Sequence, residues 1–205
     1  MNTGKQKERI IISDSDGCLV DWNSEFNEFM CELGFPQLPN TDSEYSLAVR
    51  HGIDADFAHS LVREFNESSR ISKLKPFADS VEYVTKLADL GFKFIVVTSI
   101  SDAPQAHYFR SRNLKNIFGN VFKEIHCIEM GASKANILSS NWLDTGYFWI
   151  EDHMRQAEAG YEVGLKPVLI SHPYNSHYST DLFPKVTHET PWADIYKLIE
   201  QEYDL

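Results

Sequence analysis

Residues 9–19 read RIIISDSDGCL, an apolar run that ends in two carboxylates, Asp14 and Asp16, and a glycine. Branched apolar residues such as Ile10 to Ile12 suit a strand that is buried on both faces, as the strands of parallel sheets are. Ligands of such sheets collect beyond the carboxyl ends of the strands. The stretch therefore predicts a central strand that delivers acidic chemistry at its carboxyl end.

The paired carboxylates favour a metal site. Two nearby carboxylates repel each other unless a cation or a proton lies between them, and oxygen ligands suit a hard metal such as Mg²⁺. Gly17 lets the backbone turn sharply after the second acid. A calcium loop of the EF-hand type is excluded, because its sixth position, counted from Asp14, is Leu19 instead of glycine. The remaining alternative is a solvated Asp-Ser-Asp-Gly turn without a ligand.

Composition restricts the class of protein and its partners. The chain has 205 residues, of which 42% are hydrophobic and 24% charged, enough for a buried core domain with an insertion. The formal net charge of -11 argues against polynucleotide and membrane partners, because both favour basic patches. A small phosphorylated substrate stays compatible with this charge, since a bound metal and a few local cations reverse the field near a site.

Cysteine usage and hydropathy indicate the compartment. The cysteines Cys18, Cys31 and Cys127 are widely spaced and provide neither a disulfide framework nor a paired zinc-ligand motif. The stretch from Met1 to Arg9 is polar, and no apolar run approaches the length of a membrane span, about 18 residues. We therefore expect a cytoplasmic protein. As to its assembly, a monomer or a homodimer is expected.

Apolar spacing predicts an amphipathic helix from Trp22 to Leu33 and a second helix that Asp54 caps. Beyond residue 76, helices and strands alternate, which indicates parallel strands with right-handed crossovers. Thr190 and Pro191 are typical N-cap and first-turn residues of a last helix. Residues 171–189 are expected to form a loop. Strands are predicted over residues 92–97, 124–128, 147–150 and 166–170, and helices over residues 79–90 and 104–112, from residue 133 and up to residue 203.

Polar residues follow several of these strands, in a fixed order along the chain. The set comprises Asp14-x-Asp16-Gly17, then Thr98, then Lys134, then Glu151-Asp152. This order resembles the four motifs of the haloacid dehalogenase superfamily. Within the superfamily the chain is most similar to the 5'(3')-deoxyribonucleotidases. That similarity rests on Asp21-Trp22, Leu74-Lys75-Pro76, Thr98-Ser99-Ile100 and Trp192-Ala193-Asp194.

The resemblance implies an α/β fold, a Rossmann-like three-layer parallel sheet with a small helical cap inserted after the first strand. Residues 1–20 and 77–205 would form the core domain and residues 21–76 the cap. It also implies that Asp14 is the nucleophile and that Asp16 is the general acid and then the base. Mg²⁺ would be held by the Asp14 carboxylate, the Asp16 backbone carbonyl and the Asp152 carboxylate, with Glu151 as a nearby or outer-shell acid.

Four further residues complete the expected site. Lys134 would supply positive charge toward the phosphate, with Lys123 as the substitute candidate. The Thr98 hydroxyl and the backbone N–H of Ser99 would hold phosphoryl oxygens. Trp22 lies on the inner stripe of its helix, where an aromatic side chain either packs in the core or stacks on a base or sugar.

The resulting hypothesis is a Mg²⁺-dependent phosphomonoesterase, resembling a 5'-nucleotidase, that acts on deoxyribonucleoside or ribonucleoside monophosphates. A second hypothesis keeps the same chemistry but directs it to a sugar phosphate or another small metabolite, since fold and motif do not separate the two. A third is a catalytically idle relative that binds a partner or ligand through its acidic face.

Overall fold

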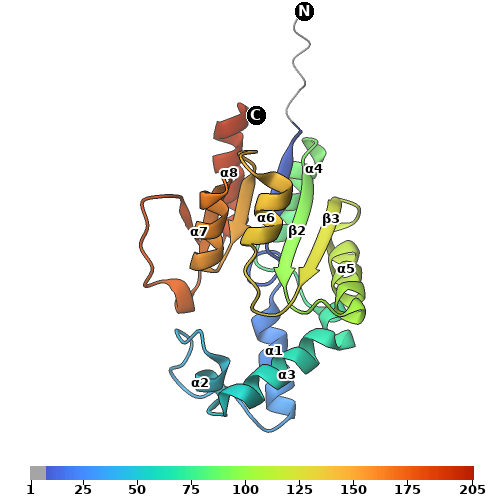
Figure 1. The fold of residues 1–205 in the computed structure, drawn as a ribbon, viewed down its shortest axis with the longest axis vertical. Helices are drawn as coiled ribbons and strands as arrows, with labels where there is room; N and C mark the ends of the chain where they lie inside the picture. Colours follow the sequence, from blue (N-terminus) through green and yellow to red (C-terminus); the bar gives the residue numbers. More distant parts are fainter. Residues whose placement is uncertain (1–7) are drawn as a thin grey trace, which may run out of the picture.

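Six parallel strands form the central sheet of the computed structural model, which describes residues 8–205 (Figure 1). Their order is β3-β2-β1-β4-β5-β6, which places the strand before Asp14 in the middle of the sheet. Residues 1–7, most of the polar stretch considered above, lie outside the described residues. The predicted parallel α/β fold is confirmed. The strands are β1 (Ile10–Ser13), β2 (Lys93–Ser99), β3 (Phe122–Ile128), β4 (Phe148–Glu151), β5 (Lys166–Ser171) and β6 (Lys185–Thr187).

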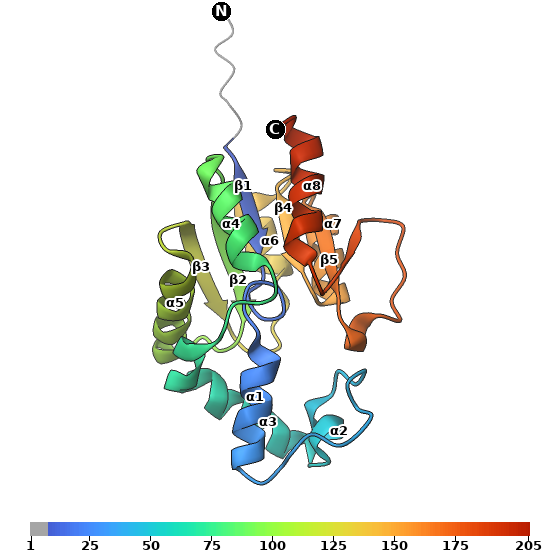
Figure 2. The same cartoon turned by 180° about the vertical axis from the view of Figure 1, so that it is seen from behind.

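Helices cover both faces of the sheet and make three layers (Figures 1 and 2). One layer contains α4 (Ser80–Asp89), α5 (Pro104–Phe118) and α8 (Pro191–Tyr203), and the other contains α6 (Ala135–Trp142) and α7 (Met154–Glu162). Successive side chains of a strand point to opposite faces. Ile11 accordingly packs in the cluster that includes Trp192, whereas Ile10 and Ile12 pack with Leu138 and Trp142.

Residues 21–76, here called the cap segment, lie beyond the carboxyl ends of the strands (Figures 1 and 2). They form α1 (Trp22–Glu32), α2 (Leu47–His51), α3 (Ala55–Glu67) and the 3-10 helix η1 (Ser69–Lys73). As the sequence indicated, Asp54 caps α3: its Oδ1 accepts the backbone N–H groups of Asp56 and Phe57 at 2.9 and 3.1 Å. These two hydrogen bonds satisfy backbone N–H groups that the start of a helix leaves without partners.

Aromatic side chains pack the cap segment against the rest of the described chain, residues 8–20 and 77–205, here called the sheet domain. Phe26 of α1 and Phe65 of α3 are fully buried and meet edge to face, with ring centroids 5.3 Å apart. They belong to the same buried cluster as Leu19 and Val20, which follow β1. The apolar core is therefore continuous from the sheet into the cap segment. This packing holds α1 and α3 in place beside the carboxyl ends of the strands.

The expected loop at residues 171–189 contains regular structure. It includes the 3-10 helix η2 (Pro173–Asn175) and the edge strand β6, which pairs with β5. Three residues are too few for a periodic signal, so β6 was not predicted. At the start of α8, Thr190 takes the N-cap position but its side chain makes no capping bond. The Asp79 carboxylate accepts the N–H groups of Trp192 and Ala193 instead, at 3.1 and 2.8 Å.

Among the helices within residues 8–205, none has the length and apolar character that crossing a membrane requires.

Candidate active site

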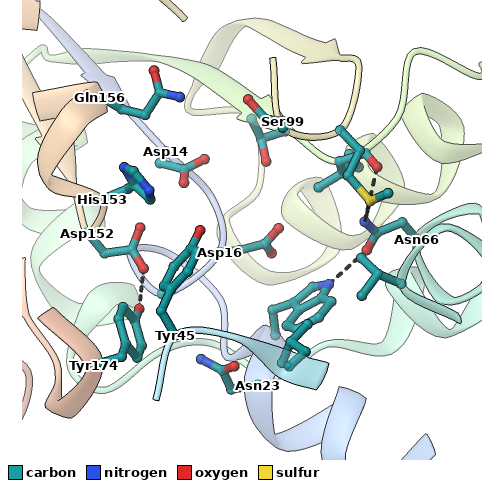
Figure 3. Close-up of a pocket in the computed structure, with 18 of the residues that line it drawn as sticks. Asp14, Asp16, Asn23, Tyr45, Asn66, Ser99, Asp152, His153, Gln156 and Tyr174 are labelled. Carbon is teal, nitrogen blue, oxygen red and sulfur yellow. Dashed lines mark hydrogen bonds between the residues drawn. The ribbon is translucent and has the colours of Figure 1, made fainter. Parts of the chain in front are cut away.

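One cavity of about 810 Å³ lies between the carboxyl ends of the strands and the cap segment (Figure 3). The side chains that line it come from both regions, and they include every site residue expected from the sequence. These are Asp14, Asp16, Trp22, Thr98, Ser99, Lys134, Glu151 and Asp152. The structure therefore brings the whole expected set together, as the edge of a parallel sheet should.

Lys134 lies between two carboxylates that line this cavity. Its Nζ is 3.0 Å from Asp14 Oδ1 and 2.5 Å from Glu151 Oε1, and all three side chains are buried. Asp14 Oδ1 also accepts the backbone N–H of Ser15 at 2.7 Å. Lys123, the substitute candidate, is half-exposed on β3 and pairs with Glu8 at 2.9 Å. Of these two lysines, Lys134 is thus the one that lines the cavity.

Glu151 has both carboxylate oxygens engaged by the protein. While Oε1 meets Lys134, Oε2 accepts the backbone N–H groups of Asp152 and His153, each at 2.7 Å. These N–H groups lie at the start of α7, where a negative charge is favourable. Glu151 therefore holds Lys134 and the backbone of the neighbouring Asp152 in place.

Two residues of the 171–189 segment hold Asp152. The Tyr174 hydroxyl donates to Asp152 Oδ2 (Figure 3). The Asn175 amide donates to the Asp152 backbone carbonyl at 2.6 Å. Sequence reasoning missed both residues, although they follow the carboxyl end of β5 and so lie at the same edge of the sheet. That position was the available signal.

Gly17 is required by the close approach of Asp152. Its φ is +72°, and a Cβ at this position would lie 2.5 Å from Asp152 Oδ2. Its backbone carbonyl also lies 2.9 Å from the Nε2 of the buried His172. Any side chain at residue 17 would therefore be strained and would displace an acid of the site.

Asp16 forms an ion pair with Arg110, a residue that sequence reasoning also missed. Arg110 Nη2 donates to both oxygens of Asp16, at 2.6 and 2.8 Å, from a side chain that is fully buried in α5. Burial raises the pKa of Asp16, and Arg110 opposes that rise. The signal was the helical spacing of Ala106, Arg110 and Leu114, which puts an arginine on the buried face of α5.

The remaining expected residues form the other walls. Thr98 is buried at the end of β2, and the Ser99 hydroxyl donates to the Ala132 carbonyl at 3.2 Å. Trp22 packs against the core and also lines the cavity. Its ring stacks on Phe26 at 4.4 Å and its Nε1–H donates to Asn66 at 2.8 Å.

Three acids form a candidate cation site. Asp14, Glu151 and Asp152 each offer a carboxylate oxygen, and these oxygens lie within 4.8 Å of one another. Burial is the main cause that raises the pKa of each acid to about 7, and the charge of a neighbouring acid adds to the rise. Lys134 opposes it with a single positive charge. Three carboxylates around one ammonium leave excess negative charge, and the all-oxygen donor set fits Mg²⁺.

Part of the chain is similar to a curated protein sequence. No family model matches the chain. An uncharacterized 32.4 kDa protein of Enterobacteria phage T4 is 24% identical over 132 residues, which cover 62% of this chain and 47% of that protein. The chain thus spans about half the length of this curated relative.

Solved structures match over almost the whole chain. A predicted phosphatase from Clostridium acetobutylicum superposes with a TM-score of 0.66 at 14% identity, covering 96% of this chain and 100% of that one. A haloacid dehalogenase-like hydrolase from Streptococcus pneumoniae gives 0.62 at 16% identity, with 94% and 99% covered. The fold is that of haloacid dehalogenase-like hydrolases. A D,D-heptose 1,7-bisphosphate phosphatase from B. bronchiseptica, solved with magnesium and phosphate, gives 0.56 at 11% identity, with 95% and 99% covered.

Proposed function

We propose that the chain is a Mg²⁺-dependent phosphomonoesterase that works through a phosphorylated Asp14. The observation that carries the proposal is the placement of Lys134 Nζ between Asp14 and Glu151, beside Asp152, in the cavity that Asp16 and Thr98 also line. A solvated turn would not bury these acids around one lysine, because buried charges are costly unless they are paired.

In the proposed first step, a carboxylate oxygen of Asp14 attacks phosphorus and the bond from phosphorus to the ester oxygen breaks. Asp14 and Asp152, with the backbone carbonyl of Asp16, would hold Mg²⁺, and Glu151 would orient them from outside. Bound Mg²⁺ supplies positive charge that offsets the repulsion between a carboxylate and a phosphate dianion. Lys134 adds charge on the same side, and Thr98 and Ser99 hold the phosphoryl oxygens in line.

Proton transfer belongs to Asp16 in this scheme. Its carboxyl group gives a proton to the departing alkoxide and then, as a carboxylate, takes one from the water that attacks the phosphorylated Asp14. That second attack releases inorganic phosphate and restores both aspartates. Arg110 fixes the position of Asp16 through its two short contacts, so that the acid lies on the cavity side of α5.

A nucleoside monophosphate, with the deoxyribonucleotide as the first choice, is the substrate that we propose. The half-buried Trp22 lines the cavity and offers an aromatic face for a base. The specific alternative is a sugar phosphate or another small metabolite, supported by the heptose bisphosphate phosphatase among the matching folds.

The deciding experiment measures phosphate release from deoxynucleoside 5'- and 3'-monophosphates, ribonucleotides and sugar phosphates, with Mg²⁺ and with a chelator. Mg²⁺-dependent release from nucleotides alone supports the nucleotidase assignment. Release from sugar phosphates would change the proposed substrate class from nucleotides to sugar phosphates. No release from any compound contradicts the enzymatic proposal and favours an idle binding protein.

A further inference from the structure

Arg50 is a buried cation without a carboxylate partner. Its side chain belongs to α2 in the cap segment, and the residue is only 7% exposed. Nη1 donates to the Asn23 amide oxygen at 3.0 Å and Nη2 to the Gln37 amide oxygen at 2.9 Å. Its Nε is buried and has no hydrogen-bond partner. Within residues 8–205 no acid comes within salt-bridge distance of this guanidinium, and the charge of Asp42 lies beyond the Gln37 amide, which donates to it.

The other deeply buried cations of the described chain each have a carboxylate partner. Arg110 pairs with Asp16, and Lys134 pairs with Asp14 and Glu151. Buried charges in proteins are normally paired, because desolvation of a lone charge is expensive. A guanidinium has five N–H donors, of which Arg50 uses two on neutral amides. Burial accordingly lowers the pKa of Arg50. Its charge is therefore available to an external anion.

The position of Arg50 identifies where that anion would bind. Arg50 lines the same cavity as Asp14. Every acid that lines this cavity comes from the sheet domain, and the cap segment contributes only neutral residues besides Arg50, with His59 counted as neutral. In the view of Figure 3, Asn23, which accepts from Arg50, lies on the far side of Tyr45 from Asp14. An anion beside Arg50 would thus contact the part of the cavity lining that carries no acid.

We propose that Arg50 binds a second anionic group of the substrate, a carboxylate or a phosphate other than the one transferred to Asp14. The inference rests on the proposed phosphatase function. Within that function it favours a small metabolite or a nucleotide with a second anionic group over a plain nucleoside monophosphate, whose one phosphate is the group transferred. The cavity, about 810 Å³, has room for such a molecule between Arg50 and Asp14. Arg155 also lines the cavity, but it is exposed, so water solvates its charge and it does not require a counterion.

The competing explanation is purely structural: Arg50 would only join α1, through Asn23, to the segment around Gln37. The two explanations differ in their response to ligand charge. If Arg50 has only a structural role, its loss changes the affinity for all ligands by a similar factor. If Arg50 binds an anion, its loss changes the ratio of the affinities for two ligands that differ in one charge. The preference is therefore the quantity to measure.

Matched pairs of compounds isolate that preference. One pair is 2-phosphoglycolate and ethyl phosphate, and the other is thymidine 3',5'-bisphosphate and thymidine 5'-monophosphate. Binding of each is measured by calorimetry with Mg²⁺ in the Asp14→Asn variant, in which turnover is blocked. We expect the compound with two anionic groups to bind at least about tenfold more tightly in one pair or both, as a charge-assisted contact would provide. The pair that responds distinguishes a carboxylate from a second phosphate.

Further variants assign the preference to Arg50. Arg50→Gln in the same background should reduce it to about twofold or less, and Arg50→Lys, which keeps the charge without the planar fork, should retain part of it. Arg70→Gln is the matched control, since Arg70 is a cap arginine paired with Glu25 and Glu32 and does not line the cavity. It should leave the preference intact. Thermal unfolding of each variant checks that it is folded.

The outcomes separate this inference from the proposed function. If Asp14→Asn binds both members of each pair equally, or if Arg50→Gln keeps the preference, the anion site is wrong even when the wild-type protein releases phosphate. If the preference depends on Arg50 but the wild-type protein hydrolyses nothing, the anion site stands and the phosphatase proposal fails.

Discussion

The two walls of the cavity differ in how their charges are balanced. The wall from the strand ends carries all the acids that line the cavity. Two buried cations are paired with these acids: Lys134, which lines the cavity, and Arg110, which contacts Asp16 from α5. The wall from the cap segment carries no acid, and its buried cation, Arg50, is unpaired. In the proposed function, the charges of the first wall act on the transferred phosphate group, whereas the charge of Arg50 on the second wall binds another anionic group of the substrate. Substitutions on the two walls should therefore have different consequences.

Asp14→Asn should have the largest effect on activity, because it removes the proposed nucleophile. Asp14 belongs to the wall from the strand ends, here called the charged wall. We expect phosphate release to fall by at least about a thousandfold, the scale on which loss of a nucleophile acts. Asp54→Asn is the matched control: it makes the same chemical change at the N-cap of α3, where asparagine caps as well as aspartate. Near-normal activity in Asp14→Asn would remove the assignment of the nucleophile.

Lys134→Met should have the largest effect on stability. It leaves Asp14 and Glu151 buried without their cation, and breaking a buried pair from one side costs about 3–5 kcal/mol. Denaturant unfolding at pH 8 measures the loss. The double variant Lys134→Met/Glu151→Gln removes one of the two stranded charges and should recover part of the stability. Equal stability of the single variant and the wild type would contradict the pairing.

The pH dependence of stability should also originate at the charged wall. Asp14 and Asp152 have pKa values raised from 3.8 to about 7, and Glu151 from 4.5 to about 7. The folded state therefore holds protons that the unfolded state has lost, so metal-free protein should lose stability as pH rises from about 4 to about 7. At pH 8, Mg²⁺ at a hundred times its Kd should restore about 2.7 kcal/mol. Thermal unfolding with and without a chelator tests both statements, and a metal-free stability that stays level over this range would contradict the first.

The charged wall was largely predictable from the sequence, because strand ends and short motifs specify it locally. Asp14, Thr98 and Asp152 each follow a run of apolar residues, and parallel strands bring such ends to one edge. Arg110 and Tyr174 were missed because their roles depend on contacts with Asp16 and Asp152, 94 and 22 residues away in the chain. Helical spacing and the position after a strand indicate that such residues are buried or lie near the site, but single-sequence patterns do not specify which acid each one contacts.

The cap segment was predictable in its main helices but not in its chemistry. Apolar spacing and the Asp54 cap indicated α1 and α3, whereas α2 has five residues, too few for a periodic signal. Arg50 lies on that short helix, and an arginine in a sequence is normally exposed. Only its burial beside amides, without an acid, distinguishes it.

Trp22→Phe should have the smallest effect on stability, because no charge is lost. Trp22 belongs to the wall from the cap segment, here called the cap wall. Phenylalanine keeps a ring beside Phe26 but loses the indole N–H, so the buried Asn66 oxygen loses its donor, at a cost of about 1 kcal/mol. Trp142→Phe is the control: this buried tryptophan, at the end of α6, packs in the core with Ile10 and Ile12 of β1, and it does not line the cavity. If the Trp22 ring also holds a base, Trp22→Phe should raise KM for a deoxynucleoside monophosphate but not for ethyl phosphate. A stability loss as large as that of Lys134→Met, or an equal rise in KM for both substrates, would show that the cap wall at Trp22 supports the whole site and does not select the ligand.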